Sequence, residues 1–332
     1  MAKHLAIAAL ALILWACDPT PTEPPVSEVP SKRIALTYDD APLGDGPMLT
    51  GTERTERFIA ELARADIPSA TIFVTTKGMD APGGHARVEA YANAGHLIAN
   101  HSHDHGWSSG LQPEAFGAEV DKAEAKLRGL ANRRAWFRFP FLDEGQYLTG
   151  DENASRDTIV AARTQRRDAF REELAQRGLL NAYVTADTFD WHLDFLWRAA
   201  VARDDAVDMG ALEAIYVAMV VDAAEHADLL SRDTLGRQAA QVLLLHENDL
   251  AAYFTDEAVA GLRAAGWTIV SADEAFSDPI SDVAPDTLFA GRGRIAAIAV
   301  DAGADMDNRF THWSADRKMM EARVAEAGVF GE

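Results

Sequence analysis

The stretch GHLIANHSHDHG, residues 95–106, joins a short apolar run to a cluster of histidines. Leu97, Ile98 and Ala99 have the composition of a buried β-strand, and the chain then turns polar within two residues and breaks at Gly106. This pattern predicts a strand of the core whose end carries a polar site.

The histidines of this stretch are spaced for metal binding. His101 and His105 stand four positions apart, which returns both rings to one side of a helix or of an extended turn. Two neutral imidazoles leave a divalent ion under-coordinated, so we expect a carboxylate ligand from another strand end. His103 lies on the same side of an extended segment and is an alternative ligand. A single histidine beside an apolar run is usually a hydrogen-bonded core residue, but three in five residues favour a metal site.

The expected carboxylate has a candidate near the N-terminus. RIALTYDD, residues 33–40, is a β-prone run that ends in Asp39 and Asp40. Neighbours on a strand point to opposite sides, but a twist at the strand end lets one carboxylate bind a metal while the other faces a water on that metal. Such a pair is more often a helix cap or a turn, and only the histidine cluster makes it a candidate site.

Composition and segment order bound the fold. The chain has 332 residues, of which 48% are hydrophobic, so one large α/β domain is expected. Helical patterns at 52–64 and 86–94 alternate with strand patterns at 33–40, 70–76 and 97–99, which predicts a parallel sheet or barrel. The net charge of −21 argues against nucleic acid as a partner, because phosphate binding relies on Lys and Arg.

The N-terminus has the pattern of an export signal. In residues 1–16, Lys3 and His4 precede an apolar run too short to span a bilayer comfortably, as in a signal peptide. Cys17 is the sole cysteine and follows Leu-Trp-Ala, which resembles a bacterial lipoprotein cleavage site, while residues 17–31 form a Pro-rich tether. We therefore expect an exported protein that lipid on Cys17 anchors to a bacterial membrane.

Three later segments add polar residues to apolar runs. Arg138 lies inside the aromatic run AWFRFPF, residues 135–141, where an unpaired buried charge is costly, so pairing with Asp39 is expected. An Arg stacked on an aromatic ring at the surface is the alternative. Residues 181–192 are predicted as a strand with acids and Trp191 at its end.

A last pair of strands completes the pattern. Residues 241–248 are predicted as an apolar strand with a polar end that includes His246, a natural proton donor for a leaving group. Residues 267–271 supply the last strand. Asp187 is the candidate partner of such a histidine. Trp191 offers a flat face for a sugar ring, although a core role is commoner for a Trp after a strand.

Together these segments carry five short motifs: TYDD (37–40), HSHDH (101–105), RFPF (138–141), DTFDW (187–191) and LLH (244–246). Their identity and order strongly resemble the polysaccharide deacetylase family, also called the NodB-homology domain or carbohydrate esterase family 4. The resemblance implies a distorted (β/α)7 barrel at residues 32–278, with its site at the C-terminal strand ends. Residues 279–332 would then be a C-terminal extension of unassigned role.

The same resemblance implies a role for each motif residue. The divalent metal, commonly zinc with cobalt or nickel as substitutes, would be held by Asp40, His101 and His105. The catalytic groups would be Asp39 as general base, Arg138 fixing Asp39, His246 as general acid and Asp187 orienting His246. Phe141, Trp191 and Leu244 would line the groove. His103 would stand outside the ligand set.

The resemblance implies a metal-dependent hydrolase that removes acetyl groups from an N-acetylated glycan, such as peptidoglycan, a chitin-like polymer or an exopolysaccharide. An O-acetyl esterase acting on an acetylated polysaccharide is a second enzymatic hypothesis. A tethered glycan-binding protein without turnover is the third, suggested by Ala41 in the place of the family's usual Gly and by long segments between motifs. The complete set of metal and acid–base residues weighs against it, because sugar binding alone needs none of them.

Overall fold

The computed structural model describes residues 32–149, 154–305 and 308–331. The predicted signal peptide, Cys17 and the tether lie outside these residues. All of the described residues belong to the larger of two compact units.

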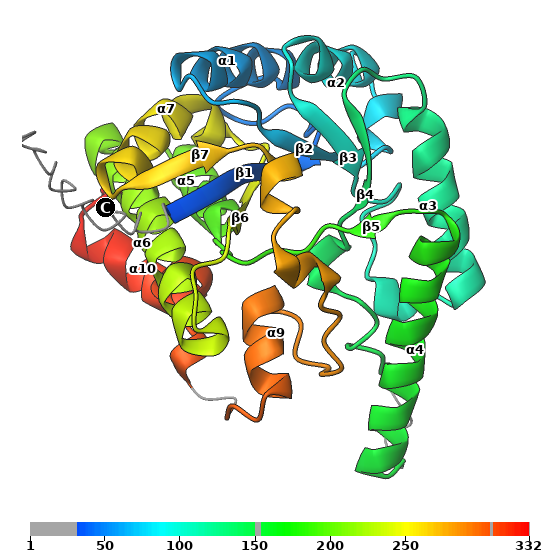
Figure 1. Cartoon of the computed structure of the whole chain (residues 1–332). Coiled ribbons are helices and arrows are strands. Elements are labelled where there is room, and N and C mark those ends of the chain that lie inside the picture. Colours follow the sequence, from blue (N-terminus) through cyan, green and yellow to red (C-terminus); the bar gives the residue numbers. More distant parts are fainter. Residues whose placement is uncertain (1–31, 150–153, 306–307, 332) are drawn as a thin grey trace, which may run out of the picture. The chain divides into compact units, whose positions relative to one another are not determined.

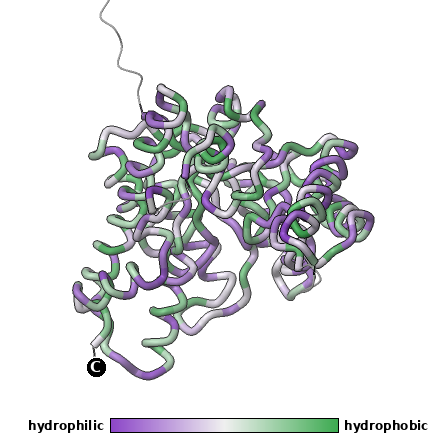
Figure 2. The backbone as a smooth tube through the Cα atoms, turned by 90° about the horizontal axis from the view of Figure 1, so that it is seen from below, coloured by the Kyte–Doolittle hydropathy of each residue, from purple (hydrophilic) through white to green (hydrophobic). Residues whose placement is uncertain are grey.

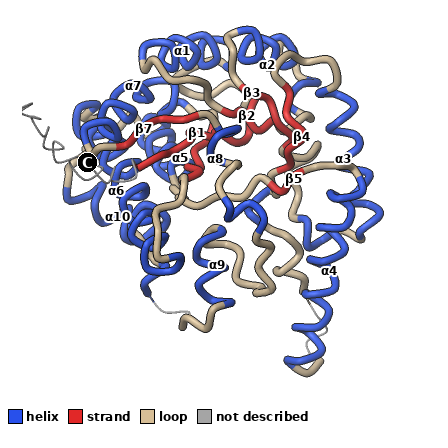
Figure 3. Tube along the Cα trace, viewed as in Figure 1, coloured by secondary structure: helices blue, strands red, loops and turns tan. Residues whose placement is uncertain are grey.

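A seven-stranded sheet forms the centre of the larger unit (Figures 1 and 3). Its strands are β1 (Lys32–Ala41), β2 (Thr71–Val74), β3 (Leu97–Asn100), β4 (Arg133–Phe137), β5 (Leu180–Asn181), β6 (Gln241–His246) and β7 (Trp267–Val270). The strand order is β5-β4-β3-β2-β1-β6, with β7 also paired to β1, and every pairing is parallel. The parallel α/β sheet predicted from the alternating pattern is confirmed.

Strand β1 is the most connected strand of the sheet. Ile34 pairs with both β6 and β7, and Tyr38 pairs with both β6 and β2. Strands β7 and β2 therefore share one edge of β1, and β6 occupies the other. The sheet curls further because Ala186, just after β5, bridges Leu243 of β6. This curled arrangement confirms the expected (β/α)7-type fold and brings the ends of distant strands together.

Helices surround the sheet (Figure 1). They are α1 (Gly51–Arg64), α2 (Gly84–Asn93), α3 (Pro113–Leu127), α4 (Arg156–Gln176), α5 (Asp190–Ala202), α6 (Met209–Leu235), α7 (Asp249–Ala264), α8 (Ala272–Ala275), α9 (Arg294–Asp301) and α10 (Arg317–Glu326). Short 3-10 turns lie at Gly78–Asp80, Ser108–Gly110, Pro140–Leu142, Pro279–Asp282, Asn308–Phe310 and Trp313–Ala315. Helix α1 packs against α7, α3 against α4, and α6 against α7.

The helix ends follow from local sequence. Thr50 caps α1 in a reciprocal pair with Glu53, because each side chain accepts from the backbone N–H of the other residue. Asn248 caps α7 by accepting from Ala251 N. Gly236 ends α6 with φ of 66°, a conformation that glycine adopts without the steric cost of a Cβ.

The predicted C-terminal extension packs into the same unit. Trp313 is 2% exposed, and its indole N–H donates to Asp222 on α6. Met320 and Val324 of α10 are buried in the main hydrophobic cluster. Phe330 forms an antiparallel bridge with Val207, just before α6. Residues 308–331 therefore cover α6 and contribute to the core.

The helices alternate hydrophilic and hydrophobic residues along their length (Figure 2), as expected when one side of a helix is buried. Helix α6, for example, buries Leu212, Tyr216 and Met219 in the core. Across the three described ranges, every helix is too short or too polar to traverse a bilayer.

A buried ion pair joins α1 to α7 and gives a test of this packing. Nε of Arg54 lies 2.6 Å from Oδ1 of Asp249, and both side chains are fully buried. Asp249→Ala leaves the Arg54 guanidinium buried without its partner, so we expect the free energy of unfolding to fall by about 3–5 kcal/mol in urea titrations. Asp121→Ala removes the partly exposed pair with Arg177 and is the control. It should cost at most about 1 kcal/mol, and equal losses for the two variants would contradict the assignment.

Candidate active site

The end of β1 turns two neighbouring carboxylates toward one point. In a regular strand Asp39 and Asp40 would face opposite sides of the sheet. The register between β1 and β2 shifts between Tyr38 and Ala41, and Asp40 has φ of 70°. This break lets both acids approach His101, whose Nε2 lies 3.7 Å from Oδ2 of Asp39 and 3.5 Å from Oδ1 of Asp40. The predicted twist at the strand end is thus a break in register.

Asp40, His101 and His105 form a cluster suited to a metal ion. One ligand atom from each lies within 4.8 Å of the other two, and no second cluster of this kind occurs among the described residues. Nε2 of His105 lies 3.0 Å from Oδ1 of Asp40. These are the three residues predicted as ligands, and they come from the ends of β1 and β3.

The donor set fits a divalent cation. Oδ1 of Asp40 is buried and has no hydrogen-bond partner, although two imidazoles lie close to it. Nδ1 of His101 pairs with the carbonyl of Arg138 at 2.9 Å, which leaves Nε2 directed at the cluster with its lone pair free. Burial lowers the pKa of His101, and metal binding requires the resulting neutral ring.

The ionisation state of Asp40 also fits a divalent cation. Burial alone would raise the pKa of Asp40, but the nearby rings of His105, His246 and His101 more than offset this and lower it well below its usual value. The carboxylate is therefore ionised at neutral pH, as a metal ligand must be.

Arg138 is buried beneath the acid pair. Its Nη1 donates to Asp39 Oδ1 at 2.7 Å and to Thr37 Oγ1 at 2.7 Å, while Nε donates to the carbonyl of Ala182. The guanidinium also lies 3.9 Å from the ring centroid of Phe73. The expected pairing with Asp39 is present, and it fixes the orientation of that carboxylate. The alternative of an Arg on the surface is wrong, because the side chain is fully buried.

His246 stands at the end of β6, across from Asp39 in the β1–β6 register. Its Nδ1 lies 2.7 Å from Oδ1 of Asp190, and its backbone N–H donates to Oδ2 of the same carboxylate. Asn248 also donates to Oδ2 at 2.9 Å. Burial alone would lower the pKa of His246, but the charges of Asp190, Asp40 and Asp39 raise it to about 10. The imidazole is therefore cationic at neutral pH.

The expected contact between Asp187 and His246 is replaced by one from Asp190. Leu244 N–H donates to the carbonyl of Ala186, and Thr188 Oγ1 donates to the carbonyl of Leu244. These bonds hold Asp187 level with Leu244, two residues before His246. The chain then turns into α5, whose first residue, Asp190, reaches the imidazole.

Asp187 has different surroundings. It is half-buried, its backbone carbonyl accepts from Ser314, and burial raises the pKa of its carboxyl to about 7. Sequence reasoning missed Asp190 because residues 181–192 were predicted to be one strand. The motif contains both Asp187 and Asp190, and its sequence alone does not show which of them contacts His246. The position at which α5 begins determines that it is Asp190.

The predicted groove residues lie around these groups. Phe141 is 44% exposed, and its ring centroid is 4.6 Å from that of His105. Leu244 is buried and precedes His246 by two residues, so both side chains leave β6 on the same side. Trp191 is half-buried in the first turn of α5, with the guanidinium of Arg317 4.8 Å from its ring centroid.

His103 does not join the cluster. Its Nδ1 pairs with Thr76 Oγ1 at 3.0 Å, and its side chain is buried. Of the two spacings that the sequence allowed, the one between His101 and His105 is the one that the structure brings together with Asp40.

Solved structures similar to this chain include carbohydrate esterases. A family 4 carbohydrate esterase from Streptomyces lividans in complex with acetate is 20% identical, with 73% of this chain and 92% of that chain covered and a TM-score of 0.43. The chitin deacetylase of Colletotrichum lindemuthianum is 18% identical, with 74% and 87% covered and a TM-score of 0.47. A CE4 family pseudoenzyme from Bacillus anthracis is 19% identical, with 74% and 66% covered and a TM-score of 0.43.

None of the curated proteins matches the chain. A protein-family model described as polysaccharide deacetylase matches residues 27–155, a segment that contains the first three motifs, TYDD, HSHDH and RFPF. Residues 27–155, which are less than half of the chain, are therefore similar to the polysaccharide deacetylase family, in agreement with the resemblance of these three motifs.

Proposed function

We propose that this protein is a metal-dependent hydrolase that removes acetyl groups from an N-acetylated glycan. The observation that carries the proposal is the convergence of Asp40, His101 and His105. Two further groups lie beside them: Asp39, which is paired with Arg138, and His246, which is paired with Asp190. A glycan-binding site needs no such combination of metal ligands, base and acid. The family match over residues 27–155 supports the choice of an acetylated polysaccharide as substrate.

Asp40, His101 and His105 would hold the metal, for which we propose zinc, with cobalt or nickel as substitutes. A divalent ion at this position would lower the pKa of a bound water and polarise the acetyl carbonyl. The carboxylate and two imidazoles are a donor set that zinc accepts, and they leave room for a further ligand.

Asp39 would act as the general base. Its Oδ1 is occupied by Arg138 at 2.7 Å, so Oδ2 is the oxygen available to take a proton from the attacking water. Because Arg138 also binds Thr37 and the Ala182 carbonyl, Asp39 is held by a rigid buried group. Orientation of this kind lowers the cost of reaching the reactive geometry.

His246 would act as the general acid. Water adds to the acetyl carbonyl carbon, the bond between that carbon and the sugar nitrogen breaks, and His246 protonates the departing nitrogen. The products are acetate and a free amine. Asp190 suits His246 to this task, because its negative charge keeps the imidazole protonated until the leaving group needs the proton.

Lipid attachment at Cys17 and export remain part of the proposal. A Pro-rich tether at residues 17–31 would let the catalytic unit act on polymer near the membrane that holds it.

The first prediction concerns the metal ligands. His101→Ala removes one of three ligands, so we expect metal content to fall from about one ion per chain to near zero and acetate release from N-acetylglucosamine oligomers to fall at least about 100-fold. A chelator should have the same effect on the unsubstituted protein. Metal content is measured by elemental analysis and acetate by an enzyme-coupled assay.

His103→Ala is the matched control, since His103 is buried in the same loop but pairs with Thr76. It should keep its metal. Loss of metal in His103→Ala with retention in His101→Ala would reverse the ligand assignment. Tight metal binding without release of acetate from any acetylated glycan would favour the non-catalytic hypothesis.

The second prediction concerns pH. The Asp190 carboxylate raises the pKa of His246, so Asp190→Asn lowers it and His246 loses its proton at lower pH. If protonated His246 is the acid, the alkaline limb of kcat/KM should move down by about 1–3 pH units. Asp187→Asn makes the same change in the same loop and should move the limb less, because no hydrogen bond joins Asp187 to His246. A larger shift in Asp187→Asn would restore Asp187 as the partner.

The third prediction separates the two enzymatic hypotheses. An amide needs protonation of its departing nitrogen more than an ester needs protonation of its departing oxygen, because the amine is the poorer leaving group. His246→Ala should therefore depress hydrolysis of N-acetylated oligomers more strongly than hydrolysis of O-acetylated xylan. Faster hydrolysis of the ester than of the amide by the unsubstituted protein, over a matched set of polymers, would favour the esterase.

A further inference from the structure

Three exposed aromatic rings lie together beside the metal cluster. Trp107 is 51% exposed, Phe141 44% and Tyr147 44%. Trp107 stacks on Phe141 with ring centroids 4.2 Å apart and an interplanar angle of 11°, and Tyr147 meets Trp107 edge-on. We call these three residues the aromatic platform. Phe141 joins it to the metal cluster through its contact with His105.

The loops that carry the platform are tied together beneath it. Asp143 is fully buried and accepts from the backbone N–H of Ser109 at 2.7 Å and from the hydroxyl of Ser109. The same hydroxyl accepts from the backbone N–H of Tyr147. This set of hydrogen bonds connects the loop after His105 with the loop after β4, and so holds together the two loops that carry Trp107, Phe141 and Tyr147.

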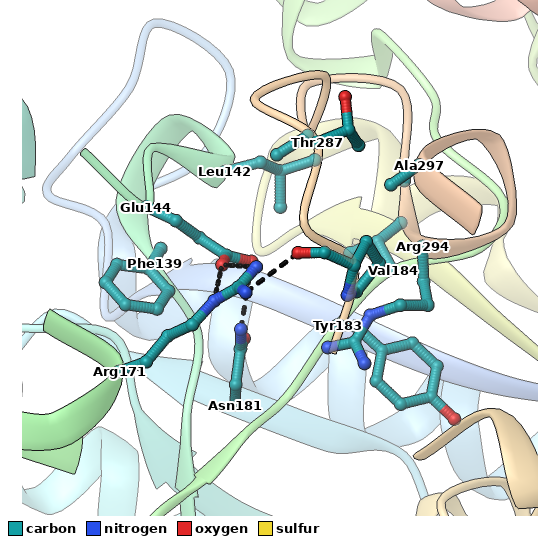
Figure 4. A pocket seen from close by; sticks show the side chains of 13 residues that line it. Phe139, Leu142, Glu144, Arg171, Asn181, Tyr183, Val184, Thr287, Arg294 and Ala297 are labelled. Atoms are coloured by element: carbon teal, nitrogen blue, oxygen red, sulfur yellow. Dashed lines mark hydrogen bonds and ion pairs between the residues drawn. The ribbon is translucent and has the colours of Figure 1, made fainter. Parts of the chain in front are cut away.

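A second set of contacts holds the platform loop from its other side. Figure 4 shows a cavity where Arg171 of α4 binds Glu144 at 2.7 Å and where Asn181 donates to the same carboxylate. Arg171 also donates to the carbonyl of Pro285 in the C-terminal segment. The cavity is thus crossed by a polar network that anchors residue 144, three positions before Tyr147. Contacts on both sides keep three large apolar side chains in place at the surface.

Ordered exposed rings beside a site indicate a binding surface. We propose that the aromatic platform binds a pyranose unit of the glycan, next in the polymer to the unit whose acetyl group is removed. This inference rests on the proposed function, and it adds that the enzyme prefers oligomers over short substrates. Trp107 and Tyr147 are specificity-determining residues in this proposal, with no part in the chemical step.

The chemistry of the platform fits a sugar. A pyranose ring has an apolar face of C–H groups, which packs on the flat face of an indole, while its hydroxyls stay in water. Phe141 stacks on Trp107, and about half of the Trp107 side chain stays exposed to a ligand. Fixed rings lose little conformational entropy on binding, so a single stacking contact can contribute measurably.

The test is chain-length dependence. We would measure kcat/KM for acetate release by the full chain from N-acetylglucosamine oligomers, dimer to hexamer. Trp107→Ala should lower kcat/KM for the hexamer about tenfold, mainly through KM, and should affect the dimer much less. Trp107→Phe keeps an aromatic face and should restore most of the loss. Leu229→Ala, a change at a 61% exposed apolar residue of α6, is the control and should behave like the unsubstituted protein.

A binding measurement separates this inference from the proposed function. Hexamer affinity is measured by calorimetry in a His246→Ala background, where turnover is suppressed, with and without Trp107→Ala. If the unsubstituted protein releases no acetate, the proposed function fails, and the calorimetry still decides whether the platform binds sugar. Equal effects on dimer and hexamer, or no effect on either, would overturn the inference. So would a change only in oligomeric state by sedimentation, which would make the platform a self-association surface.

Discussion

The site depends on one local break in the sheet. A continuous pairing of β1 with β2 would send Asp39 and Asp40 to opposite faces, where they could not serve a common centre. The shift in register and the positive φ of Asp40 place both carboxylates within 3.7 Å of His101. A non-glycine residue in this conformation costs of order 1–3 kcal/mol, and the parallel pairings of its two neighbours, Asp39 with His246 and Ala41 with Val74, flank it.

Asp39 and Asp40 have different neighbours, which suit them to different proposed roles. Arg138 is fully buried and occupies Asp39, whereas Asp40 keeps a buried oxygen without a hydrogen-bond partner beside two imidazoles. On the β6 side of β1, the Asp190 carboxylate raises the pKa of His246, which keeps the imidazole protonated as the proposed general acid requires. The same residue type thus has different surroundings at each position, and these suit each carboxylate to a different proposed role.

The sequence predicted most of the elements and the five motif positions, because apolar periodicity and polar strand ends are local signals. Sequence reasoning failed where contacts between distant segments determine which residues meet. The acidic partner of His246 was assigned to Asp187, since residues 181–192 were predicted as one strand. In the structure β5 has two residues, Ala186 bridges β6, and α5 begins at Asp190. The contact of Trp107 with Tyr147 likewise depends on two loops that share no sequence pattern.

The C-terminal segment explains why Asp190 and Trp191 hold their positions. Phe189 N–H donates to the carbonyl of Ser314 at 2.6 Å, and the Ser314 hydroxyl donates to the carbonyl of Asp187. Ser314 is itself fixed by its neighbour Trp313, which is buried against α6. The loop that delivers the partner of His246 is therefore bound on one side by β6 and on the other by residues 313–315. Residues 313–315, in an extension that sequence alone left without a role, therefore help to hold Asp190 beside His246, the proposed general acid.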